Sequence, residues 1–188
     1  MKTHGYLIFH INLGFSSIEK EARDDLIKLC YHPLLDFIDL NQTPVGIEIS
    51  GWSLEELKKS DPKWIEKLKR LISLGLCELI GSGYSQLIGP LVPHHVNDWN
   101  QQLGREVYEE ILGCRPRIAL TNEMAFSNSM VDLYKAHKYN GFILDRRNLK
   151  LALGSEDKLG DGCFVQMKGP NGSVLPVLWS DSILFKNS

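Results

Sequence analysis

The sequence lacks a long apolar run, a paired-cysteine motif and a strong excess of charge. No apolar segment approaches the ~20 residues that a membrane-spanning helix needs, so no membrane interaction is predicted. The net charge of -2 and the pI near 6.3 argue against nucleic acid as a partner. Its four cysteines are scattered, with no Cys-x-x-Cys. Reduced thiols in a cytoplasmic protein are the simplest interpretation.

Signatures for phosphate, dinucleotide and metal binding are also missing. There is no Gly-x-x-x-x-Gly-Lys loop, no Gly-x-Gly-x-x-Gly and no Gly-x-Ser-x-Gly. His94 and His95 are adjacent, so their side chains point apart and make poor joint ligands. We therefore expect neither a cofactor nor a catalytic metal.

What the sequence does contain is an alternation of strands and helices. Its 188 residues, 43% of them hydrophobic, suit one domain (1–188) with a sizeable core. Strands that alternate with helices predict a parallel sheet covered by helices, either an open doubly wound sheet or most of a barrel. The predicted strands cover residues 5–13, 45–49, 76–80, 117–121 and 141–144, followed by a hairpin of 163–167 and 174–179.

Helix boundaries follow from capping and proline signals. Ser53-Leu-Glu-Glu56 fits a capping box and predicts a helix start at that serine. His32-Pro33 predicts an interruption of the first helical segment, and the next helix after strand 117–121 is predicted over residues 127–138. A polar loop is expected over 154–162.

Polar side chains end or follow each predicted strand. In α/β folds the carboxyl edge of the sheet is where ligands bind, because the loops there converge. Each residue alone has an ordinary explanation, such as a core histidine or an ion-paired carboxylate, but together they indicate a pocket. The set is His10, Asn12, Glu48, Glu78, Tyr84, Asn122, Glu123 and Asp145.

The most informative stretch is Arg117-Ile-Ala-Leu-Thr-Asn-Glu-Met-Ala-Phe126. It places Asn122 and Glu123 where a strand ends and a helix begins. A carboxylate at this place can act as a nucleophile or as a general acid/base. The alternative is that Glu123 only caps the following helix, as acidic residues in a first turn often do.

Three segments resemble the motifs of glycoside hydrolase family 57. Phe9-His-Ile-Asn-Leu13 lies where the family has its first motif, usually His-Gln-Pro, of which only the histidine is present. Gly75-Leu-Cys-Glu-Leu-Ile80 resembles the second, a Gly-x-x-Glu run. Ile118 to Phe126 resembles the third, whose glutamate is the nucleophile. The resemblance implies an irregular seven-stranded β/α barrel and retaining chemistry on α-glucans or related α-glycosides.

By the resemblance, Glu123 is the nucleophile, and His10 and Glu78 bind sugar near it. No aspartate in this sequence matches the family's acid/base residue well, so that residue is expected to lie beyond Ser188. The barrel is therefore expected to be incomplete at its C-terminus. An open barrel edge invites pairing with another chain, so self-association is expected. The partner is an oligo- or polysaccharide.

Two other functions remain open on the sequence. A non-catalytic saccharide-binding domain would use Glu123 only to hydrogen-bond its ligand. A metal-dependent polysaccharide deacetylase, also a seven-stranded β/α barrel by resemblance, would need Asp and His ligands that the sequence does not offer in a recognisable spacing.

Overall fold

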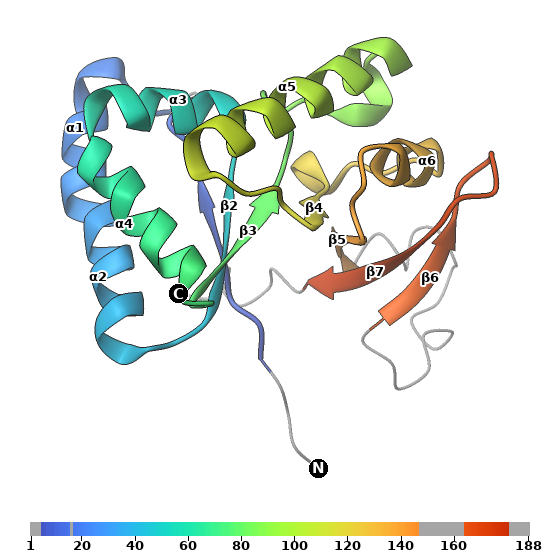
Figure 1. Ribbon diagram of the computed structural model, residues 1–188. Helices are drawn as coiled ribbons and strands as arrows, with labels where there is room; N and C mark the ends of the chain where they lie inside the picture. Colours follow the sequence, from blue (N-terminus) through green and yellow to red (C-terminus); the bar gives the residue numbers. More distant parts are fainter. Residues whose placement is uncertain (1–4, 16, 147–163, 181–188) are drawn as a thin grey trace. The chain divides into compact units, whose positions relative to one another are not determined.

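The fold is α/β, with strands and helices alternating along the chain as the sequence predicts (Figure 1). The computed structural model describes residues 5–15, 17–146 and 164–180. The predicted loop 154–162 and Cys163 lie outside these residues. The described chain divides into two compact units, each with its own hydrophobic core.

Unit 1 comprises Met1–Ser85 and Gln101–Pro116. Its strands β1 (Ile8–Ile11), β2 (Val45–Ile49) and β3 (Cys77–Gly81) are parallel, with β2 in the middle. Every residue of β2 is buried. A central parallel strand that is covered on both faces reads as a continuous apolar run, which explains why Glu48 stands out in it.

The helices of unit 1 are α1 (Arg23–Leu26), α2 (His32–Asn41), α3 (Gly51–Ser60), α4 (Pro62–Ser73) and part of α5 (His94–Leu112). The side chains that face the strands recur at helical spacing. On α4 they are Trp64, Ile65, Leu68 and Leu71, all buried, while the charged residues between them face solvent. Figure 1 shows α4 lying alongside α2, which it contacts.

Two predicted helix boundaries in unit 1 are wrong. The first helical segment is not interrupted at His32-Pro33 but continues through a π-helical turn over Ile27–Tyr31. This wider turn ends two residues before Pro33, whose ring would press against an earlier carbonyl in a regular α-helix. Helix α3 starts at Gly51, because the Ser50 hydroxyl accepts a hydrogen bond from the Ser53 N–H (3.2 Å) and caps it directly after β2.

Unit 2 comprises Gln86–Asn100 and Arg117–Ser188. Strands β4 (Ile118–Leu120), β5 (Gly141–Asp145) and β7 (Val174–Ser180) are parallel, and β6 (Phe164–Lys168) pairs antiparallel with β7. The predicted hairpin is thus confirmed. Helix α6 covers Ser129–Ala136, shorter than the predicted 127–138, because the chain first makes an irregular turn after β4.

Aromatic side chains fill the core of unit 2. The rings of Tyr134 and Tyr139 meet edge to face at 5.6 Å, and Phe126 stacks on Phe142 at 5.4 Å. Burial raises the pKa of Tyr134 to about 12. These contacts pack α6 and the turn before it onto β5, which fixes the backbone that follows β4.

Candidate functional site

His10 and Glu48 form a dyad in unit 1. They are register partners on neighbouring parallel strands, so their side chains project from the same face of the sheet. The Nδ1 atom of His10 contacts a carboxylate oxygen of Glu48. The Glu48 side chain is fully buried, whereas 49% of the His10 side chain is exposed. The buried carboxylate therefore orients an imidazole that is about half exposed.

Glu48 keeps further accepting capacity. Its Oε1 atom is buried and has no hydrogen-bond partner among the residues that the structure describes. A buried carboxylate oxygen without a donor is costly. Glu48 Oε1 is thus a buried acceptor without a hydrogen-bond partner among the described residues, next to His10, the one histidine of the predicted site set.

Tyr108 on α5 holds the ends of β2 and β3 together and was missed by the sequence analysis. Its hydroxyl donates to the Ile49 carbonyl (2.6 Å), lies 3.2 Å from the Gly83 carbonyl and accepts from the Ser82 N–H (3.3 Å). Burial raises its pKa, and the nearby Glu48 carboxylate adds to the effect. A tyrosine within the otherwise apolar face of a helix was the signal that could have revealed it.

The backbones of α5 and the segment after β3 approach unusually closely. A Cβ atom on Gly104 would lie 2.5 Å from the Gly83 carbonyl carbon and 2.7 Å from the Tyr84 nitrogen. Only glycine fits there. The contact fixes Tyr84, whose hydroxyl donates to Glu55 (3.0 Å) and whose pKa is raised by burial and by that carboxylate.

The other predicted site residues of unit 1 lie on β3 and in the loops that follow β1 and β3. Glu78 on β3 is the register partner of Gly46 on β2, which lies two residues before Glu48. Glu78 and Glu48 therefore project from the same face of the sheet, at neighbouring levels. It lies near Tyr6, whose pKa is raised to about 12, mainly by burial and also by the Glu78 charge. The Asn12 side-chain oxygen accepts from the Gly14 N–H (2.9 Å) in its own loop.

In unit 2, Glu123 lies in a left-handed turn at the carboxyl end of β4. Its φ is 52° and that of Met124 is 53°, in a short 3-10 turn over Asn122–Met124. Consecutive left-handed residues other than glycine are uncommon and strained, and such strain concentrates at functional sites. Met124 and Phe126 pack against the core of unit 2, so the turn directs Glu123 outward.

Glu123 is exposed, and its carboxylate makes no hydrogen bond or ion pair with any other described residue. It does not cap α6 either, because that helix starts six residues later at Ser129 with Asn128 as N-cap. The capping interpretation of Glu123 is therefore wrong. The structure leaves this carboxylate with no structural partner among the described residues.

Asn122 and Asp145 occupy the same level next to this turn. Leu120 and Ile143 are register partners, and Asn122 and Asp145 each lie two residues beyond them. Both are buried, and Asp145 is in turn the register partner of Ser180 on β7. Polar side chains thus end three neighbouring strands of unit 2.

Two features that other functions would need are absent from the described residues. Among them, no group of three or more His, Cys, Asp or Glu side chains is placed to hold a metal ion. None of the helices in the part of the chain that the structure describes is long and apolar enough to cross a bilayer.

The sequence profile of Glycosyl hydrolase family 57 matches residues 9–179. The chain belongs to this family. It is 31% identical over 90 residues to Alpha-amylase 1 of Dictyoglomus thermophilum, a match that covers 45% of this chain and 13% of the amylase. The β1, β3 and β4 motifs all lie within the matched profile, so the resemblance based on them is confirmed.

Solved structures of the family have the same fold. The 4-alpha-glucanotransferase of Thermococcus litoralis superimposes with a TM-score of 0.81 at 18% identity, over 95% of this chain and 27% of that one. The branching enzyme of Pyrococcus horikoshii gives 0.71 at 15% identity, over 95% and 47%. The predicted fold class, a seven-stranded β/α barrel type, is confirmed. The chain spans less than half the length of each of these relatives.

Proposed function

We propose that this chain is part of the catalytic region of a retaining glycosidase or glycosyl-transferring enzyme that acts on α-glucans or related α-glycosides, with Glu123 as the nucleophile. One observation carries the assignment of Glu123. It is an exposed carboxylate with no partner among the described residues, held in a strained left-handed turn at the end of β4 in a family 57 chain. The relatives named as an amylase, a glucanotransferase and a branching enzyme point to α-glucans.

The reaction proceeds in two displacements. A carboxylate oxygen of Glu123 attacks the anomeric carbon, the bond to the leaving oxygen breaks, and a general acid protonates that oxygen. The glycosyl-enzyme then reacts with water or an acceptor hydroxyl, deprotonated by the same second group, which releases Glu123. Hydrolysis and transfer differ only in the acceptor.

His10 and Glu48 have different tasks in this proposal. His10, whose side chain is about half exposed, hydrogen-bonds a sugar hydroxyl, while Glu48 contacts its Nδ1 atom and holds the ring in place. The remaining polar set contributes hydrogen bonds to sugar hydroxyls. Its members are Asn12, Glu78, Tyr84, Asn122 and Asp145.

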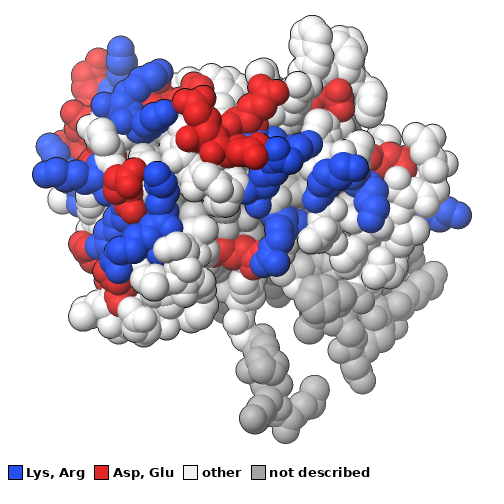
Figure 2. Space-filling model, in the orientation of Figure 1, with Lys and Arg blue, Asp and Glu red and all other residues white. Residues whose placement is uncertain are grey.

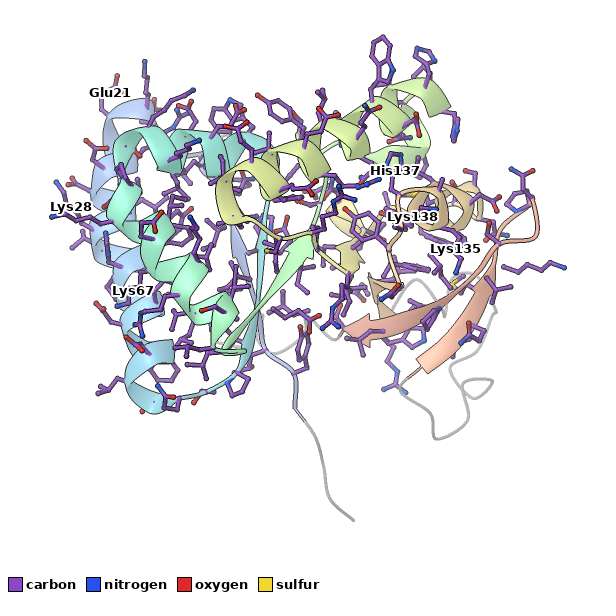
Figure 3. All side chains as sticks on the ribbon, viewed as in Figure 1. Glu21, Lys28, Lys67, Lys135, His137 and Lys138 are labelled. Carbon is purple, nitrogen blue, oxygen red and sulfur yellow. The ribbon has the colours of Figure 1, made fainter. Side chains whose placement is uncertain are left out.

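The test of this function is covalent labelling of the full 188-residue chain with an activated α-glycosyl fluoride. Fluoride needs little acid assistance, so the first displacement does not depend on which residue serves as the general acid. We expect a sugar-sized mass gain that maps to Glu123. Glu123→Gln abolishes the gain, while Glu21→Gln, a matched change at an exposed glutamate of the first helical turn (Figure 3), leaves it intact.

If the chain binds saccharide but forms no adduct, the proposed enzyme function is wrong and a non-catalytic saccharide-binding domain is favoured. An adduct on another carboxylate would overturn the role of Glu123 while leaving a retaining mechanism in place.

We also propose a cytoplasmic location and self-association. The location is supported by free thiols at Cys30, Cys77 and Cys114. Association is supported by β6, which among the described strands pairs only with β7 and so has an open edge. Light scattering that gives the mass of one chain at all concentrations would contradict the association.

A further inference from the structure

A pocket in unit 1 lies outside the polar set described above. Its cavity volume is about 230 Å³, and it opens between the end of β1, the first helical turns and the end of α3. Five of its seven lining residues are charged. The lining residues are Leu13, Lys20, Arg23, Asp24, Glu56, Lys59 and Ser60.

Arg23 is held in this pocket without an anionic partner. Its guanidinium carbon lies 5.2 Å from the centre of the Trp52 ring, a cation–π contact that fixes the side chain. Its Nε atom is buried and has no acceptor among the described residues. Although Asp24 and Glu56 line the same pocket, neither forms an ion pair with Arg23.

The other cations leave the pocket with an excess of positive charge. Lys20 makes no ion pair within the described chain, and Lys59 binds Glu56 (2.9 Å), which raises the lysine's pKa. Three cations therefore face two carboxylates, one of which is already engaged. Figure 2 shows such mixed basic and acidic clusters over the helices of unit 1.

We propose that this pocket binds a small oxyanion of the phosphate class, through the guanidinium of Arg23 and the ammonium groups of Lys20 and Lys59. A guanidinium presents a planar fork of donors that matches phosphate oxygens, and Arg23 has a buried donor awaiting an acceptor. The cavity is smaller than the ~300–1,000 Å³ of pockets for drug-sized ligands. That size favours a phosphate group over a whole nucleotide.

Occupation of the pocket would link three segments. Lys20 and Arg23 come from the first helical turns, Lys59 comes from α3, and Leu13 lies at the end of β1. The Leu13 N–H is itself bonded to the Ser53 hydroxyl (3.2 Å). The anion would therefore brace the segment that follows His10, and it would raise the melting temperature of the chain.

The experiment titrates the full chain with inorganic phosphate at constant ionic strength and follows binding by calorimetry and by tryptophan fluorescence, since Arg23 covers Trp52. We expect saturable binding. Arg23→Ala weakens it roughly tenfold or more, the loss expected for a charge-assisted hydrogen bond. Lys20→Ala weakens it less. Lys28→Ala, at an exposed lysine on the same helical run but outside the pocket (Figure 3), leaves it unchanged.

Two further arms keep the test decisive. Arg23→Lys retains the charge but loses the fork, and it should weaken phosphate more than acetate. Glucose 1-phosphate in place of inorganic phosphate separates a phosphorylated sugar from the free ion, since the tighter of the two identifies the source. If Arg23→Ala fails to fold, Lys20→Ala and Arg23→Lys carry the test. No saturable binding, or equal weakening by Lys28→Ala, overturns the proposal.

Discussion

Two glutamates at strand ends, one in each unit, have opposite surroundings. Glu48 is fully buried inside a parallel sheet and engages His10, while Glu123 is exposed in a strained turn and engages no described residue. A carboxylate that already serves a neighbour is suited to orient it, and one without a partner is available to react. Burial and hydrogen bonding, more than residue type, therefore distinguish the positioning role proposed for Glu48 from the nucleophilic role proposed for Glu123.

The largest effect should come from removing the unpartnered carboxylate. Glu123→Gln keeps the volume and the turn but removes the proposed nucleophile, and we expect the rate of glycosyl-enzyme formation to fall on the order of 10⁴-fold or more. The measurement is the time course of adduct mass with a glycosyl fluoride. If the rate of glycosyl-enzyme formation fell by less than tenfold, Glu123 would not be the nucleophile. The two glutamates would then not differ in role as proposed.

The next largest effect should come from disturbing the close backbone contact in unit 1 between Gly104 on α5 and the residues Gly83 and Tyr84. Gly104→Ala would place a methyl group against the backbone of Gly83 and Tyr84, and we expect a loss of about 1–3 kcal/mol in the free energy of unfolding. Alanine is intrinsically better in a helix by ~1 kcal/mol, so a stabilised variant would show that the contact is not tight. Denaturant unfolding measures this, with Gly5→Ala as the control because nothing lies near that Cβ position.

A smaller effect should follow from neutralising the positioning carboxylate. Glu48→Gln retains an acceptor for His10 but removes the buried charge, so we expect roughly tenfold weaker substrate binding with little change in the maximal rate of labelling. Labelling rate against glycosyl fluoride concentration separates the two quantities. A collapse of the maximal rate with unchanged binding would give Glu48 a direct chemical role, and the distinction from Glu123 would disappear.

The smallest effect is a pH dependence of stability in unit 2, and it involves neither glutamate. Asp132 on α6 accepts from the Asn171 N–H (2.9 Å) and the Ser173 N–H (3.3 Å) of the β6–β7 turn, which hold its pKa below the usual value. The stability that it contributes is present above its unfolded-state pKa of about 3.9 and is lost as the pH falls through the lower folded-state pKa.

Thermal unfolding of the wild type and of Asp132→Asn measures this contribution. We expect the two to differ slightly at neutral pH and to converge below pH 4. A difference that grows on acidification would contradict the assignment. Asp25→Asn, which changes an exposed aspartate of unit 1 outside the cationic pocket, is the control for general charge effects.

Elements with a strong local signal were predictable from the sequence. The strand that contains Val45 to Ile49 and the amphipathic pattern of Trp64, Ile65 and Leu68 match the observed β2 and α4. The hairpin was predictable because Pro170 to Gly172 offers turn residues between two apolar runs. Such features depend on neighbours in the chain.

Features that depend on distant partners were not predictable. Ser53 fits a capping box, but Ser50 caps α3 because β2 ends directly before it. The hydroxyl of Tyr108 reaches the carbonyl of Ile49, 59 residues away, and no periodicity reveals that. The polar set was found by its place at strand ends, whereas the pairing of His10 with Glu48 required the register of β1 against β2.

If Glu123 is the nucleophile as proposed, its left-handed turn also limits which residues can replace it when a related chain loses catalysis. Positive φ excludes β-branched residues almost entirely, while Asn, Asp and Gly tolerate it. A descendant chain that abandons catalysis while keeping its fold is therefore expected to carry asparagine, aspartate or glycine at this position, and valine or isoleucine there would mark a turn that has been rebuilt. The residue at the position of Glu123 in a non-catalytic relative would therefore indicate whether that relative has kept the left-handed turn seen here.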